Sequence, residues 1–125
     1  MIWNKGVKTH KPTKILKGYF AVYIFEYKGK ILKVGKSCGI KNNDRYYWHH
    51  YIIKAANSNL AKSLNNDLKY QKLIGEEKIS DWMMKNLNRY NLLIPIEYGK
   101  HFVNFAEAFF ILKYNPLFEG KLILN

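Results

Sequence analysis

The stretch from Gly18 to Ser37, GYFAVYIFEYKGKILKVGKS, constrains the fold more than any other part of the chain. Residues 20–27 are rich in aromatic and β-branched residues, which is typical of a β-strand, and residues 31–36 repeat the pattern over a shorter length. The polar segment between them, residues 28–30, contains a glycine that can adopt a positive φ. The sequence therefore predicts a β-hairpin with a three-residue loop.

The hydrophobic pattern also predicts the register of this hairpin. A three-residue loop pairs Tyr27 with Ile31, Phe25 with Lys33 and Tyr23 with Gly35. One face then carries an apolar set suited to a core: Phe20, Val22, Ile24, Leu32 and Val34. The opposite face carries Tyr23, Phe25, Lys33 and Gly35, and a slip of one residue would mix the two sets. Because glycine leaves space beside a phenol and an ammonium, we expect this second face to be open and suited to binding a phosphate.

The length and composition limit the class of protein. A chain of 125 residues corresponds to one domain with enough core to fold unaided. The single cysteine, Cys38, excludes an intramolecular disulfide and a zinc site with several cysteines. The sequence contains no apolar run of the ~20 residues needed to span a membrane and no signal-peptide pattern, so we expect a cytoplasmic protein without a membrane partner.

The charge of the chain points to a polyanionic partner. Lys and Arg number 21 against 9 Asp and Glu, which leaves a net charge of +12. Residues 1–41 hold ten lysines and one acid, Glu26. Nucleic acid is the first expectation for such a balance, ahead of a membrane surface. The alternative is a soluble basic protein whose many lysines, asparagines and isoleucines reflect biased base composition.

The rest of the chain supplies helices and a third strand. Residues 1–17 are expected to form a basic arm with little regular structure. A helix is predicted over 43–56, a second over 57–74 that ends at Gly75, and a short third helix that Ser80 or Asp81 caps and that runs to Leu87. Residues 90–98 predict a strand, and Pro95 places it at a sheet edge because proline cannot donate to a ladder. The first hairpin strand should then lie in the middle of a three-stranded antiparallel sheet.

Two of the predicted helices carry candidate functional residues. Arg45 and His49 are four residues apart and so share a helix face, although each taken alone is more readily explained as a solvated arginine and a packing histidine. Glu107 is the only acid of an apolar helix predicted over 101–113. A carboxylate in such surroundings must be paired or bind a cation. The alternative is that Glu107 lies with Asn104 on a solvated stripe and pairs with a lysine.

These positions together resemble the GIY-YIG nuclease family. A strand ending in Val22-Tyr23 is followed after ten residues by Lys33-Val34-Gly35, and then by Arg45, His49, Glu107 and Asn115-Pro116 in the family's order. Ala21 stands where the family has its first glycine, and Lys33 where it has its second tyrosine. The resemblance covers residues 18–120, except for residues 57–89, which we interpret as a helical insertion within a single domain, 1–125. The closest types are the small stand-alone restriction enzymes and the phage endonucleases that degrade DNA.

The resemblance implies an α+β fold, a small three-stranded antiparallel sheet flanked by helices, and a metal-dependent DNA endonuclease. Glu107 would bind one Mg²⁺ or Mn²⁺ per active site. Tyr23 would act as general base, and Lys33 would favour its phenolate. His49 could relay a proton, and Arg45 would neutralise charge on the phosphate. Asn115 would position the glutamate or the backbone. Further DNA contacts are expected from Lys28, Lys30, Lys36, Ser37 and Lys41. The DNA would be double-stranded and the protein a homodimer or larger assembly. The alternative is a catalytically inactive basic module on the same fold that binds DNA or RNA.

Overall fold

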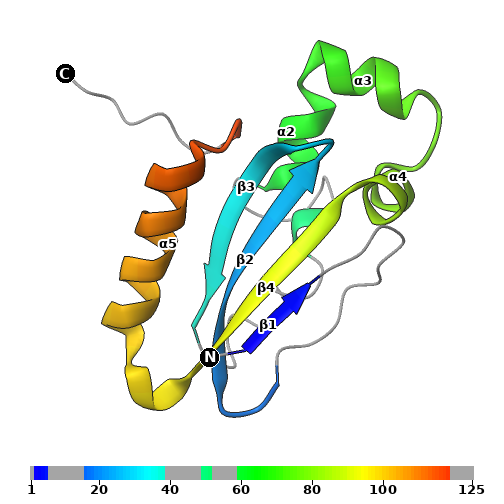
Figure 1. Cartoon of the computed structure of the whole chain (residues 1–125). Coiled ribbons are helices and arrows are strands. Elements are labelled where there is room, and N and C mark those ends of the chain that lie inside the picture. Colours follow the sequence, from blue (N-terminus) through cyan, green and yellow to red (C-terminus); the bar gives the residue numbers. More distant parts are fainter. Residues whose placement is uncertain (1, 6–15, 39–48, 52–58, 119–125) are drawn as a thin grey trace.

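A computed structural model describes residues 2–5, 16–38, 49–51 and 59–118 of the chain (Figure 1). Its centre is an antiparallel sheet with the strand order β1-β4-β2-β3. The strands are β1 (Ile2–Lys5), β2 (Tyr19–Tyr27), β3 (Lys30–Ser37) and β4 (Asn88–Pro95). The fold is therefore of the α+β class, with a small antiparallel sheet and helices, as the sequence predicts.

The three predicted strands are present, and β2 lies between β3 and β4, which confirms the central place of the first hairpin strand. Two expectations at the outer edge are wrong. The N-terminal arm includes a strand, because β1 pairs with β4 from Ile2↔Leu93 to Lys5↔Tyr90. As a result β4 is an inner strand over these residues. Pro95 lies beyond the last β1–β4 pair, Ile2↔Leu93, and is matched only with Tyr19 of β2. The N–H that proline lacks therefore removes no hydrogen bond from the β1–β4 ladder.

The hairpin turn is tighter than predicted. Lys28 and Gly29 both have a positive φ, 46° and 82°, which is the backbone of a two-residue hairpin turn that follows the twist of the strands. Tyr27 therefore pairs with Lys30 and not with Ile31. A β-bulge opposite Phe25 and Glu26 absorbs one residue and restores the predicted pairs Phe25↔Lys33 and Tyr23↔Gly35. The bulge also turns Leu32 to the face that carries Tyr23, which corrects the face predicted for it.

Among the described residues, three short helices and a 3₁₀ turn lie between β3 and β4. They are η2 (His49–Tyr51), α2 (Leu60–Asn65), α3 (Leu68–Ile74) and α4 (Ile79–Asn86). The single helix predicted over 57–74 is thus two helices. Asp67 separates them, because its side chain accepts a hydrogen bond from the Tyr70 N–H and caps α3. Gly75 ends α3 with a φ of 60°, as predicted. The helix predicted over 43–56 lies outside the described residues except for the 3₁₀ turn.

The chain after β4 turns sharply into the last helix. The predicted strand over 90–98 ends at Pro95, and η3 (Ile96–Tyr98) replaces its last three residues. Helix α5 (Lys100–Tyr114) then follows within one residue of the predicted bounds. Asn115 ends it in the left-handed region, with φ 46° and ψ 65°.

The sheet separates two cores (Figure 1). On one face α5 packs Val103 and Ala106 against apolar residues of β2, β3 and β4. On the other face η2 and the helices α2 to α4 cover Tyr23, Phe25 and Leu32. The segment predicted as an insertion, residues 57–89, therefore supplies much of the second core. None of the helices that the structure describes is long and apolar enough to cross a membrane.

Candidate active site

The predicted site residues that the structure describes lie on both faces of the sheet. Tyr23 and Lys33 point into the core under α2 to α4, whereas Glu107 lies on α5 against the opposite face. His49 begins η2, but its side chain lies outside the described residues, as do Arg45 and Lys41 altogether. The six positions implied by the resemblance are thus not gathered on one face of the sheet.

The space left by Gly35 is occupied by the ring of Tyr23. A Cβ built on Gly35 would lie 2.5 Å from Cε2 of Tyr23 and 2.7 Å from its Oη. Tyr23 is 0% exposed and Lys33 is 8% exposed. The expectation of an open, phosphate-sized face is therefore wrong, because η2 and the following helices cover this side of the hairpin. Because Gly35 has no Cβ, the phenol ring of Tyr23 can pack directly against the backbone of β3.

The partner of the phenol is His50, the neighbour of the predicted His49. Oη of Tyr23 lies 2.8 Å from Nε2 of His50. The other ring nitrogen, Nδ1, accepts the backbone N–H of Leu60 at 3.1 Å. Because a backbone N–H can only donate, Nδ1 carries no proton, and the proton of the neutral ring is on Nε2. His50 therefore donates to the phenol oxygen, so it cannot receive the phenol's proton at Nε2.

A buried arginine that the sequence analysis missed completes this cluster. Arg89 of β4 is 3% exposed and pairs laterally with Phe25. Its guanidinium carbon lies 4.9 Å from the ring centroid of Tyr23 and 5.1 Å from that of Phe25. Its Nε donates to Oδ1 of Asn91 at 2.9 Å, and Nη1 donates to Oη of Tyr51 at 3.2 Å. The alternation of Arg89, Asn91 and Leu93 with Tyr90, Leu92 and Ile94 was the available signal, but the predicted strand began two residues after the start of β4.

Donated hydrogen bonds and a cation both favour the ionised form of a phenol. The neutral His50 donates to Oη of Tyr23, and the Arg89 guanidinium lies over the ring of the same residue. Lys33 is two residues before Gly35 on the neighbouring strand and faces the same core. This set, Tyr23, His50, Arg89 and Lys33, is called the phenol cluster below. In this cluster His50 donates to Oη of Tyr23, Arg89 lies over the aromatic ring, and Lys33 shares the same face of the sheet.

Glu107 belongs to a second cluster beside the end of β3. Its Oε1 lies 3.7 Å from Nζ of Lys36, and the same ammonium donates to Oδ1 of Asn104. Asn104 and Glu107 are one helical turn apart on α5, so both oxygens approach the ammonium from the same helix. The pairing of Glu107 with a lysine, the alternative raised by the sequence, is thus present in the structure. Lys36, Asn104 and Glu107 are called the carboxylate cluster below.

The pKa of the sole cysteine, Cys38, is affected by charged residues of the carboxylate cluster. Burial is the main effect on Cys38 and raises the pKa of its thiol. Lys36 and Lys100 oppose this change because a cation favours the thiolate, and Glu107 adds to it. The charges of both Lys36 and Glu107 therefore act on the pKa of this thiol.

The oxygens of the carboxylate cluster suit a hard divalent cation. The ammonium of Lys36 already lies where the Glu107 carboxylate and the Asn104 amide oxygen converge, which shows that this point accepts positive charge. Mg²⁺ is usually bound through one or two carboxylates together with waters and substrate phosphates, and this cluster has one carboxylate, Glu107. Among the described residues there is no group of three or more His, Cys, Asp or Glu side chains that could hold a metal.

The two clusters lie on opposite faces of β3, an edge strand of the sheet. The phenol of Tyr23 lies over Gly35, and the next residue, Lys36, leads to the carboxylate cluster on the opposite face. The phenol cluster and the carboxylate cluster are therefore held by adjacent residues of one edge strand.

The remaining predicted residues have other surroundings. Ser37 is fully buried, while Lys28 and Lys30 are exposed at the hairpin turn. Asn115 caps α5 through its left-handed backbone. Comparison of the chain with protein-family models, with curated proteins and with solved structures gives no match. The interpretation of the site therefore rests on the chain's own residues.

Proposed function

We propose that this protein is a metal-dependent DNA endonuclease whose reaction centre lies at the edge of the sheet, beside Gly35 and Lys36. One observation carries the proposal. A phenol supported by a histidine donor and a guanidinium lies over one residue of the edge strand, and a carboxylate lies beside the side chain of the next. The strongly positive chain, at +12, supports a polyanionic substrate.

The phenol cluster would provide the base. Tyr23 would take the proton of the attacking water at Oη, and the N–H of His50 together with the guanidinium of Arg89 would stabilise its phenolate. In this role His50 orients and stabilises, and it does not relay the proton. Arg45 remains the proposed partner of the phosphate in the transition state.

The carboxylate cluster would hold the ion and the substrate. Glu107 and Asn104 would bind a single Mg²⁺ or Mn²⁺, which when bound neutralises charge on the scissile phosphate and its leaving oxygen. Lys36 would then leave its place between the two oxygens and contact a phosphate as a point charge. Because the lysine and the ion neutralise the same carboxylate, binding of the ion releases a cation for the DNA.

Nicking of supercoiled plasmid tests the proposal, with Mg²⁺, with Mn²⁺ and with EDTA. Glu107→Gln should abolish cutting while DNA binding is retained, and Tyr23→Phe should slow it by ~10²-fold or more, the order of a positioned proton-transfer group. Glu97→Gln removes the same charge from an exposed residue just before α5 and is the matched control. Cutting that survives Glu107→Gln, or that proceeds in EDTA, would remove the metal site from the proposal.

A second candidate is a catalytically inactive module that binds DNA or RNA. The observation that favours it is burial, since Tyr23 has no exposed surface and Glu107 is already paired with Lys36. In that case the phenol fills the space over Gly35 and the ion pair fastens α5 to β3. Wild-type protein that binds DNA but never nicks it, with either metal ion, would decide for this candidate.

The assembly state bears on which product forms. A chain with one reaction centre cuts both strands of a duplex most directly as a symmetric pair. We therefore expect a homodimer, at least on DNA, and linear product at early times. Light scattering after gel filtration, with and without a duplex, tests this expectation.

A further inference from the structure

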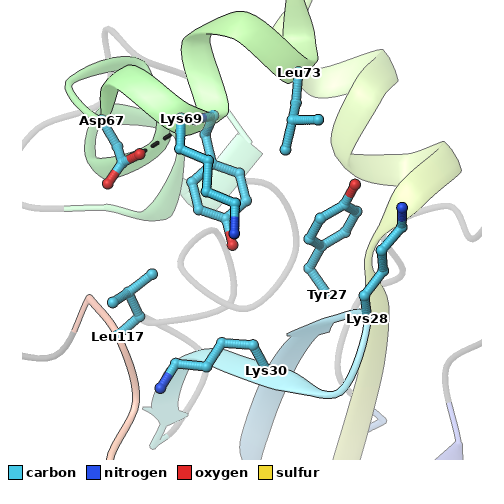
Figure 2. A pocket seen from close by; sticks show the side chains of 8 residues that line it. Tyr27, Lys28, Lys30, Asp67, Lys69, Leu73 and Leu117 are labelled. Atoms are coloured by element: carbon cyan, nitrogen blue, oxygen red, sulfur yellow. Dashed lines mark hydrogen bonds between the residues drawn. The ribbon is translucent and has the colours of Figure 1, made fainter.

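A pocket at the tip of the hairpin lies away from both clusters. It has a volume of about 570 Å³ and is bounded by the β2–β3 turn and by α3. Figure 2 shows Tyr27 and Lys28 on one side of this pocket, Lys30 below it, and Lys69 reaching down from the helix. A volume of this size is within the range of small-molecule binding sites.

The walls of the pocket are largely apolar and aromatic. Half-buried Tyr27 provides a π-surface, whereas Tyr70 is 2% exposed and contributes little surface, and Leu73 and Leu117 complete the lining. Burial is the main cause that raises the pKa of the Tyr70 hydroxyl, with smaller effects from Asp67 and Tyr27, so this residue adds no negative charge near neutral pH. Flat uncharged surfaces of this kind stack on nucleobases without selecting a sequence.

The rim of the pocket is positively charged. Of the described residues that line it, three are lysines, Lys28, Lys30 and Lys69, and one is an acid, Asp67. The carboxylate of Asp67 is engaged as the cap of α3, because its Oδ1 accepts the Tyr70 N–H at 3.2 Å. Lysine ammonium groups bind phosphate as point charges. The pocket therefore offers an excess of positive charge to an anionic ligand.

The cations and the rings are close enough for one ligand to contact both. Nζ of Lys28 lies 5.4 Å from the ring centroid of Tyr27, and Nζ of Lys69 lies 5.8 Å from that of Tyr70. We propose that this pocket binds one nucleoside monophosphate unit, with the base against the ring of Tyr27 and the phosphate on the lysines. The ligand would be a free nucleotide or one nucleotide of a single strand, and the same chemistry serves both.

This inference goes beyond the proposed nuclease activity and does not depend on it, because it concerns binding at a site apart from the phenol and carboxylate clusters. Isothermal titration with dTMP, with thymidine, with inorganic phosphate and with a 5′-phosphorylated four-residue oligothymidylate measures it directly. We expect dTMP to bind more tightly than thymidine and than phosphate, because each of these lacks one half of the ligand. Tighter binding of the oligothymidylate than of dTMP would identify a single strand as the source, and equal binding would identify the free nucleotide.

Charge variants on the rim test the location. Lys69→Gln and Lys28→Gln should each weaken dTMP binding by on the order of tenfold. Lys72→Gln, on the exposed side of the same helix and outside the pocket, should leave it unchanged. Tyr27→Leu should weaken dTMP while leaving phosphate binding as it was. Thymidine or phosphate binding as tightly as dTMP, or an equal loss from Lys72→Gln and Lys69→Gln, would overturn the proposal.

Discussion

The ring of Tyr23 fits closely over Gly35, and this fit depends on the absence of a Cβ at residue 35. Because a Cβ on residue 35 would lie 2.5 Å from Cε2 of Tyr23, the ring must move before alanine can be accommodated. We expect Gly35→Ala to lower the free energy of unfolding by ~1–3 kcal/mol, the usual cost of overpacking. Urea denaturation measures it. In a Tyr23→Ala background the same substitution should cost much less, and additive effects would show that the two residues do not meet.

The hydrogen bonds of His50 make a prediction about a single proton. Since Leu60 N–H donates to Nδ1, the imidazole should be neutral and protonated at Nε2. Long-range ¹H–¹⁵N correlation spectra distinguish the two ring nitrogens directly. Tyr23→Phe should leave this tautomer unchanged, because the backbone N–H fixes it. A proton on Nδ1 in either protein would contradict the assignment and return His50 to the role of a possible base.

The packing of α5 on the end of β3 can be tested through the reactivity of Cys38. The thiolate is the reactive form, and Glu107 raises the pKa of this thiol whereas Lys36 lowers it. Glu107→Gln should therefore increase the rate of alkylation at mildly alkaline pH, and Lys36→Gln should decrease it. Cys38 is the only cysteine, so the rate has one source. Changes of the same sign in both variants would show that α5 does not present Glu107 beside β3.

Asn115 ends α5, and variants at this position can distinguish a structural role from a chemical one. Its φ of 46° is a left-handed conformation that glycine adopts without strain and that costs other residues ~1–2 kcal/mol. We expect Asn115→Gly to keep both stability and plasmid nicking, and Asn115→Ala to lose about 1 kcal/mol. Thermal melts and the nicking assay measure the two effects. A stable Asn115→Gly protein that no longer cuts DNA would restore the role that the family resemblance implies.

The elements show which parts of the molecule could be predicted. The pattern of apolar residues predicted β2, β3 and α5, because each of these segments has one strong hydrophobic pattern. The pairs Tyr23↔Gly35 and Phe25↔Lys33 were predicted from the same pattern. The turn was misjudged because a non-glycine residue, Lys28, accepts a positive φ there. The site was only partly predictable: the resemblance singled out Tyr23 and Glu107, but neither the burial of Tyr23 under distant helices nor the approach of Arg89 from β4 is encoded locally.

For the molecule as a whole, the net charge of +12 predicts binding that depends steeply on salt. Each phosphate neutralised on duplex DNA contributes about −0.9 to the slope of log Kobs against log salt. Fluorescence anisotropy over a salt series should give a slope of several units. Loss of Lys36, a proposed phosphate contact, should reduce it by about one, whereas Lys72→Gln should not. Affinity that stays flat across moderate salt would mean that the lysines reflect composition and that the partner is not nucleic acid.

The strand order has a consequence for how the chain is made. The β2–β3 hairpin closes a short loop and can form at once. Tyr23, in contrast, pairs with Asn91, which lies 68 positions later in the chain, and Ile2 pairs with Leu93. Because closing such long loops is slow, this topology favours late assembly and modest folding rates. During synthesis the hairpin has apolar side chains on both faces, and its inner strand has an unpaired side, until β4 leaves the ribosome. A nascent chain stalled before residue 88 should therefore be a strong client for chaperones and prone to aggregate.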